Sequence, residues 1–278
     1  MKKNNKKEEI VNGIIDTEKK ISRNQFIEEV KKGFTFMVGT SIFGVFLNQL
    51  DASTGKPAAK KVVLNGDYDP YAHNWAYLID INKCIGCGMC VRGCKKENNV
   101  PDGCFRTWIE RYFIEEGKPT QIDSPNGGLD GFKPLHKTND QSRAYFVPKM
   151  CNHCDHSPCN QVCPVGAAFK TPDGVVLVDE KHCVGCGYCI QACPYGSRFI
   201  LPGPHVASKC TWCYHRITRG GKPACVQACP TGTRMFGDLS DPNDPLRKRL
   251  AKERVQVLKP DLLTYPQVSY LGLDKEVR

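Results

Sequence analysis

Several sequence signatures of enzymes and membrane proteins are missing from this 278-residue chain. It has no glycine-rich nucleotide loop and no catalytic dyad, so the sequence assigns no catalytic residues. No Cys-x-x-Cys-His sequence occurs, which argues against covalent haem attachment. No apolar run follows residue 253, so we expect no C-terminal membrane span.

Cysteine, in contrast, is abundant and unevenly placed. Sixteen of the seventeen cysteines fall into four groups, at residues 84–94, 151–163, 183–193 and 210–229. Disulfide frameworks are typical of small secreted chains with poor cores, whereas 278 residues that are 40% hydrophobic can build a core. Cysteines two residues apart are also badly placed to bridge each other. The grouping therefore indicates metal ligation.

The spacing within the groups indicates iron–sulfur clusters. The first and third groups read Cys-x2-Cys-x2-Cys-x3-Cys, the bacterial ferredoxin run, in which three cysteines hold one [4Fe–4S] cluster and the fourth reaches a second. The second and fourth groups keep this order of ligands but lengthen the middle step. Zinc is the main alternative, because paired Cys-x2-Cys units also build zinc sites, but zinc gives no reason for the longer run.

A repeated hexapeptide, Gln-x-Cys-Pro-x-Gly, closes three of the groups at residues 161–166, 191–196 and 227–232. Its proline lacks an N–H and is expected to stop the helical turn, and its glycine lets the backbone approach inorganic sulfide. Four other glycines are expected to allow the same approach in the tightest loops: Gly86, Gly88, Gly185 and Gly187.

The net charge of +10 does not by itself indicate a nucleic-acid partner. Each oxidised cluster with four thiolates carries roughly −2, so four clusters contribute about −8 and leave a nearly neutral protein. No helix-turn-helix and no aromatic RNA-binding strand accompanies the basic residues. We therefore expect no binding of nucleic acid.

The local patterns predict short elements in an α+β fold. Four segments have strand-like compositions: residues 75–82, 105–113, 144–147 and 175–178. Each cysteine group is expected to lead into a brief helical turn. Residues 115–141 are rich in Gly, Pro, Asp and Asn and are expected to form a surface loop or insertion. Residues 246–253 can form one helix, followed by an extended tail.

A few other residues near the groups are candidates for a role. Cys104 belongs to no group and is expected to be a buried apolar thiol, with an unrecognised ligand or redox role as the alternative. Trp212 and Tyr188 lie inside cysteine loops, where we expect them to keep water off a cluster. Four histidines lie beside ligands and are expected to be packing or surface residues: His153, His156, His182 and His215.

From residue 75 to residue 273 the sequence resembles the four-cluster iron–sulfur subunits of the DMSO-reductase and polysulfide-reductase type. The similarity is carried by CNHCDHSPC from residue 151, the string CVGCGYCIQACPYGSRF, the string KCTWCYHRITRGGKPACVQACPTGTR, and the tail segments FGDLSDPNDP and TYPQVSYLG. The resemblance implies two ferredoxin-like dicluster halves: an outer half of residues 75–114 with 205–240, and an inner half of residues 143–204. The chain then divides into an N-terminal tail with an apolar segment (1–60), a four-cluster domain (61–278), an insertion (115–142) and a C-terminal extension (241–278).

The resemblance also implies how the cysteines are shared among four [4Fe–4S] clusters, with the first group paired to the fourth and the second to the third. The implied ligands are Cys84, Cys87, Cys90 and Cys229 for cluster 1; Cys151, Cys154, Cys159 and Cys193 for cluster 2; Cys183, Cys186, Cys189 and Cys163 for cluster 3; and Cys210, Cys213, Cys225 and Cys94 for cluster 4.

A family of this kind implies a non-catalytic electron-transfer subunit in a hetero-oligomeric complex. Its expected partners are a catalytic molybdenum- or tungsten-pterin subunit and a polytopic, quinone-reactive membrane subunit. An alternative is a relay between a multihaem c-type cytochrome and the quinone pool, without a pterin enzyme. A free soluble polyferredoxin is the third possibility.

The N-terminal region has the layout of an export signal or anchor. Residues 33–50 form an uncharged apolar run of 18 residues, close to the roughly 20 of a spanning helix. The preceding Ser-Arg-Asn-Gln-Phe resembles the twin-arginine motif, with Asn24 in place of the second arginine. That route exports folded cargo, which suits clusters inserted in the cytoplasm. We expect a membrane-associated protein on the periplasmic, extracytoplasmic face; a helix packed in the protein's own core or against a neighbour is the alternative.

Overall fold

Residues 68–134, 142–275 and 277 are described by the computed structural model, and all of them belong to the unit Ala59–Arg278. The expected tail, the apolar run at residues 33–50 and the motif around Asn24 lie outside the described residues. The described chain mixes short strands with short helices, which agrees with the predicted α+β class. Within it, no helix combines the length and apolar character required to cross a bilayer.

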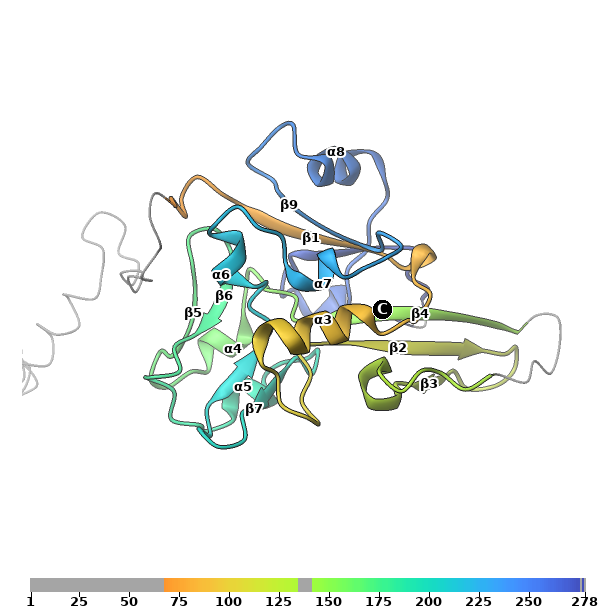
Figure 1. Cartoon of the computed structure of the whole chain (residues 1–278), viewed down its shortest axis with the longest axis horizontal. Helices are drawn as coiled ribbons and strands as arrows, with labels where there is room; N and C mark the ends of the chain where they lie inside the picture. The colour runs from red at the N-terminus through yellow and green to blue at the C-terminus, as the bar shows by residue number, and fades with distance from the viewer. Residues whose placement is uncertain (1–67, 135–141, 276, 278) are drawn as a thin grey trace, which may run out of the picture. The chain divides into compact units, whose positions relative to one another are not determined.

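One three-stranded sheet joins segments that are far apart in the sequence. Its central strand β1 (Trp75–Asp80) pairs antiparallel with β9 (Arg234–Asp238) and parallel with β10 (Val268–Leu271). Every residue of β1 after Trp75 is buried, because both faces of the strand are covered. The sheet thereby brings the beginning and the end of the described chain together (Figure 1).

Helix α8 (Pro245–Lys252) covers one face of this sheet. Asp244 caps its N-terminus, since its carboxylate accepts a hydrogen bond from the backbone N–H of Leu246 at 2.7 Å, and Pro245 suits the first turn. Leu246 packs on Leu78 of β1 in a small apolar cluster. The helix predicted near residues 246–253 is thus confirmed.

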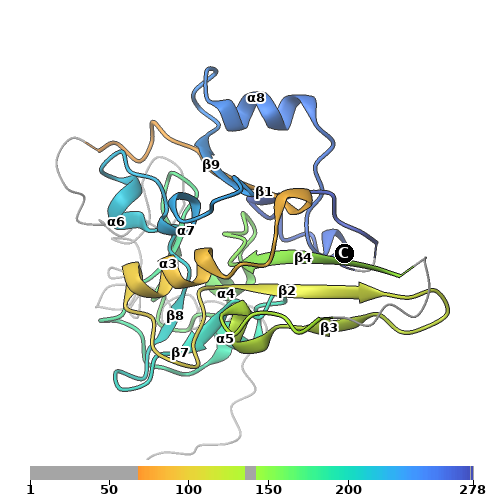
Figure 2. The same ribbon diagram turned by 45° about the vertical axis from the view of Figure 1, so that its right-hand side comes forward.

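A second sheet forms a long antiparallel ribbon (Figure 2). Strand β2 (Thr107–Ile114) pairs along its whole length with β4 (Arg143–Met150) and also pairs with the short strand β3 (Gln121–Asp123). Residues 115–141 are therefore not wholly a loop, because they include β3 and the 3-10 turn η2 (Pro125–Gly128). The composition concealed β3, which has only three residues and is held by backbone pairing to β2.

Two small hairpins separate the later cysteine groups. One joins β5 (Ala168–Lys170) to β6 (Val176–Val178), and the other joins β7 (Arg198–Ile200) to β8 (Ala207–Lys209). Each hairpin begins shortly after a repeated hexapeptide. It therefore connects the end of one cysteine group to the start of the next.

A helix begins inside each cysteine group, as predicted. These helices are α3 (Met89–Asn98), α4 (Pro158–Gln161), α5 (Tyr188–Gln191) and α7 (Ala224–Gln227). The excursion in the fourth group forms α6 (Tyr214–Ile217), and η1 (Ile81–Lys83) precedes the first group. Helices α3 and α7 come from the first and fourth groups and pack closely, because a Cβ on Gly93 would lie 2.8 Å from the Cβ of Ala228.

The C-terminal tail contains two elements that the sequence did not predict. It contains the 3-10 turn η3 (Pro260–Leu262) and strand β10, in which Val268 and Tyr270 are fully buried. The four residues of β10 are too few to form a recognisable apolar run. Pairing with β1 turns this short segment into part of the core.

Candidate iron–sulfur sites

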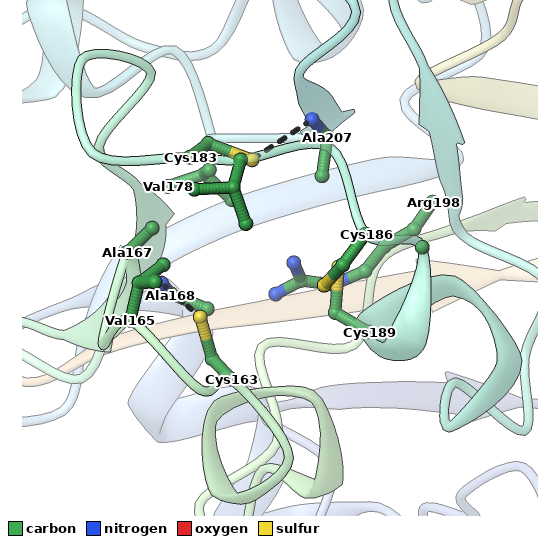
Figure 3. A pocket seen from close by; sticks show the side chains of 12 residues that line it. Cys163, Val165, Ala167, Ala168, Val178, Cys183, Cys186, Cys189, Arg198 and Ala207 are labelled. Atoms are coloured by element: carbon green, nitrogen blue, oxygen red, sulfur yellow. Dashed lines mark hydrogen bonds between the residues drawn. The ribbon is translucent and has the colours of Figure 1, made fainter. Parts of the chain in front are cut away.

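Two cavities of nearly equal size are each lined by one set of expected ligands. The first is lined by the four cysteines assigned to cluster 3: Cys163, Cys183, Cys186 and Cys189. Figure 3 shows their sulfurs arranged around a common space. The second is lined by the four assigned to cluster 2: Cys151, Cys154, Cys159 and Cys193. We call the four cysteines assigned to one cluster a site, and each site takes the number of its cluster.

The second and third cysteine groups exchange their fourth cysteines between these two cavities. Cys163 closes the second group in sequence but lines the cavity of the third, and Cys193 does the reverse. This exchange is the one that the ferredoxin run describes. Backbone N–H groups also face the thiols: that of Ala168 donates to Cys163 Sγ at 3.4 Å, and that of Ala207 donates to Cys183 Sγ at 3.3 Å (Figure 3).

At site 1 the first group meets the last cysteine of the fourth. The pKa of Cys84 is raised to about 11, mainly by burial, and the nearby Cys90 and Cys229 contribute to this rise. Cys229 itself has a lowered pKa, because hydrogen bonds with Thr231 and neighbouring backbone outweigh its burial. Cys87, in the loop before α3, is exposed.

Site 4 mirrors this arrangement. The side-chain N–H of Asn98 donates to the sulfurs of both Cys94 and Cys213 at 3.6 Å. The pKa of Cys94 is raised to about 12, mainly by burial, and the nearby Cys225 and Cys213 contribute to this rise. Cys210 is buried, and it lies near enough to Cys94 and Cys225 for their charges to raise its pKa. The last cysteine of the first group therefore lies with the first three of the fourth.

The four sites follow one another in the order 1, 4, 2, 3. Cys90 of site 1 is close enough to Cys225 of site 4 for the charge on one to raise the pKa of the other. Cys210 of site 4 is related in the same way to Cys151 of site 2. Arg198 lines the cavities of both site 2 and site 3. Sequence order and spatial order thus differ.

Buried cations among the thiols show that the sites suit an anionic group. Arg198, Lys209 and Arg234 are 5%, 1% and 2% exposed. Among the described residues, none of them forms an ion pair with a carboxylate, although a lone cation in a dry interior is costly. Clusters held by four thiolates are negatively charged. The residues present therefore fit [4Fe–4S] clusters.

The thiols surround spaces and do not converge on a point. In the described part of the chain, no three Cys, His, Asp or Glu side chains are placed to hold one metal ion. Iron binds thiolates, whereas burial raises the pKa of Cys154 to about 12. Cluster binding at this buried thiol therefore displaces a proton.

The remaining candidates lie beside or outside the sites. Trp212 is 1% exposed and packs on the buried ring of His153, whereas Tyr188 is exposed. Cys104 is half-buried, so the expectation of a buried thiol is wrong; it lies in the short turn between α3 and β2. The other three histidines make contacts near the surface. His156 contacts Tyr265, His182 contacts Asp179, and His215 contacts Glu97.

The sequence reasoning missed the buried cations, although a signal was present. The repeated hexapeptide extends by two residues in the third and fourth groups, giving Gly-Ser-Arg198 and Gly-Thr-Arg234. The second group has Ala168 at that position. Lys209 directly precedes Cys210, where a basic residue resembles an ordinary surface position.

Comparison with known families defines the class of protein. Two models of the 4Fe–4S dicluster domain match the chain, one at residues 83–167 and the other at residues 142–239. Together they cover all four cysteine groups. The chain thus contains two 4Fe–4S dicluster domains of ferredoxin-like type.

Curated relatives define the family more closely. The chain is 43% identical to a tetrathionate reductase subunit of Salmonella typhimurium, over 73% of this chain and 74% of that protein. It is 35% identical to a putative dimethyl sulfoxide reductase iron–sulfur subunit of Halobacterium salinarum, over 72% and 79%. It is 33% identical to Hdr-like menaquinol oxidoreductase iron–sulfur subunit 1 of Archaeoglobus fulgidus, over 88% and 99%. The chain belongs to the iron–sulfur electron-transfer subunits of the DMSO-reductase family.

Proposed function

We propose that this chain relays electrons through four [4Fe–4S] clusters between a catalytic molybdenum- or tungsten-pterin subunit and a quinone-reactive membrane subunit. The row of four thiol sets carries the proposal. Each end set has one exposed cysteine, Cys87 in site 1 and Cys186 in site 3, whereas all cysteines of the two middle sets except Cys193 are buried. A bound [4Fe–4S] cluster supplies one-electron redox chemistry. The protein insulates the middle of the row and leaves its ends open.

Exposed apolar side chains flank both ends. Ile85 and Met89, which are 61% and 44% exposed, flank Cys87, and Val184 and Tyr188, which are 64% and 57% exposed, flank Cys186. Apolar surface of this kind, next to a redox site, suits contact with another subunit. We assign one end to each redox partner.

The relatives support both kinds of partner. Their names include tetrathionate reductase and dimethyl sulfoxide reductase subunits, which supports a reductase at one end. The menaquinol oxidoreductase subunit supports quinol chemistry at the other end. The quinol chemistry of that relative is shared by the second candidate function, a relay between a multihaem c-type cytochrome and the quinone pool.

Purification of the native complex tests the proposal. We expect about sixteen irons per chain, four for each cluster, together with molybdenum or tungsten and a polytopic membrane subunit. Haem staining with no molybdenum or tungsten would establish the cytochrome relay instead. A lone monomer on gel filtration would establish a free polyferredoxin.

We also propose that the chain works on the extracytoplasmic face of the membrane. The support is the motif around Asn24 and the apolar run at residues 33–50. Fractionation of cells that carry the full chain, before and after inactivation of twin-arginine export, tests the location. Recovery of the chain in the cytoplasmic fraction in both cases would contradict the proposed location.

A further inference from the structure

We propose that Arg198, Lys209 and Arg234 place one buried cation at each junction between neighbouring sites, where they raise the reduction potentials of the adjoining clusters. The inference rests on the proposed function, because it requires a cluster at each site. Its basis is the position of the three cations relative to the thiols.

Arg198 lies at the junction between sites 2 and 3. It lines both cavities, and its Nη2 donates a hydrogen bond to Cys159 Sγ of site 2 at 2.9 Å. Charge attraction also links it to Cys189 of site 3. Figure 3 shows the guanidinium reaching into the cavity beside Cys186 and Cys189. Its Nε and Nη1 are buried without a hydrogen-bond partner among the described residues, so they are free to face an anion.

Arg234 occupies the matching junction between sites 1 and 4. Its charge acts on Cys90 of site 1 and Cys225 of site 4. Its Nη2 donates to Thr107 Oγ1 at 2.7 Å, which positions the guanidinium, and its buried Nε has no partner among the described residues. Arg234 stands at the same position after its hexapeptide as Arg198 does, so the internal repeat has placed an arginine at a junction twice.

Lys209 completes the row at the junction between sites 4 and 2. Its Nζ donates to the backbone carbonyl of Cys210 at 2.6 Å. The charges of Cys151 and Cys159 from site 2 also act on it, together with that of Cys210 from site 4. The order of cations along the row is therefore Arg234, Lys209, Arg198.

Another buried arginine shows how this fold compensates a cation that lies away from the cysteines. Arg111 is 7% exposed, and its Nε and Nη2 donate to the carboxylate of Asp123 at 2.8 and 2.6 Å. The junction cations have no such carboxylate among the described residues, which leaves their charge for the clusters.

The electrostatic consequence follows from the charge of the clusters. An added electron makes a cluster more negative and repels an electron on its neighbour, and this repulsion is strong in a medium of low dielectric constant. A cation between two sites attracts the added electron on either of them. It therefore makes both clusters easier to reduce.

Redox titration of the complex, followed by electron paramagnetic resonance, tests the inference. Arg198→Met is expected to lower the potentials of the clusters at sites 2 and 3, and Arg234→Met those at sites 1 and 4. We expect at least a tenfold fall in the ratio of reduced to oxidised cluster at a fixed potential, which is 59 mV for a one-electron couple. Arg198→Lys and Arg234→Lys keep the charge and are expected to restore most of the shift.

Two matched controls separate this role from loss of a buried or basic side chain in general. Arg111→Met removes a buried arginine paired with a carboxylate, and Lys248→Met removes an exposed cation on α8; neither is expected to move a potential. Unchanged potentials in methionine variants that hold their full iron would overturn the inference.

Iron content decides the remaining cases. If a methionine variant loses iron while its lysine counterpart loads fully, positive charge is required at the junction and the inference stands. Equal loss in both variants would mean that the shape of arginine matters and would overturn it. The iron content and partner subunits of the unmodified complex test the proposed function separately, so the two failures are distinguishable.

Discussion

His153 and Trp212 stack on each other with their ring centroids 4.1 Å apart, between the second and fourth cysteine groups. Each residue directly precedes the second cysteine of its group and has a left-handed backbone, with φ of 45° and 51°. The first and third groups have Gly86 and Gly185 at this position, with φ of 70° and 68°. The four loops thus share a backbone conformation, but only the two middle sites carry rings there. The stacked rings therefore join the loop of site 2 to the loop of site 4.

Removal of this stack is expected to destabilise the protein. Trp212→Ala should cost about 3–5 kcal/mol, the usual range for a buried tryptophan. A double-mutant cycle with His153→Ala should give a coupling energy of about 0.5–1.5 kcal/mol. Denaturant unfolding of the cluster-loaded chain measures both quantities. Trp108→Ala, at a partly exposed ring, serves as a control with a smaller loss, and a coupling energy near zero would contradict the role of the stack.

Cys186 and Cys104 provide a matched pair for testing the ligands. Cys186→Ala is expected to lower the iron content and the visible absorbance by up to about a quarter, because one of four clusters loses a ligand. Cys104→Ala is expected to leave both unchanged, since Cys104 belongs to none of the four thiol sets. Iron analysis with a visible spectrum makes the comparison. An unchanged spectrum in Cys186→Ala would refute the assignment of site 3.

The loop of site 3 is expected to tolerate only glycine at residue 185. A Cβ there would lie 2.2 Å from the backbone oxygen of His205, and φ is already +68°. Gly185→Ala should therefore cost more than the roughly 1–2 kcal/mol of left-handed backbone alone and should reduce iron at this site. Gly220→Ala is the control, because its φ is +75° but nothing lies within 4 Å of the added carbon. Equal unfolding midpoints for the two variants would contradict the close contact.

The buried thiols predict a stability loss in alkali that depends on iron. Burial raises the pKa of Cys84 to about 11 and that of Cys154 to about 12. An unfolded chain releases these protons near pH 9, so between pH 9 and 12 it binds fewer protons than the folded iron-free chain, and the free energy of unfolding falls. In the loaded protein the thiolates are bound to iron and this loss should be absent.

Urea unfolding at about pH 8 and about pH 11, under reducing conditions, measures this difference. The iron-free chain is expected to show a lower urea midpoint at the higher pH. A midpoint that falls equally in the loaded chain would point to groups other than the ligand thiols.

Local pattern predicted several parts of this protein well. The family and the dicluster character followed from residues a few positions apart, and both are confirmed by the relatives and the matched domains. Strand β1, the helical turns and α8 were also predicted, because each depends on its own composition. Strands β3 and β10 were missed, since three or four residues carry little periodicity and their partners are distant.

The sequence by itself determined the chemistry of the ligands, because two or three residues between cysteines set how neighbouring sulfurs can face one cluster. The tertiary structure alone decided which groups lie next to each other. Pairing of β1 with β9 and β10, and packing of α3 on α7, bring the first group to the fourth. It also decided that Arg198, Lys209 and Arg234 are buried between sites, since burial depends on segments that meet only in the folded chain.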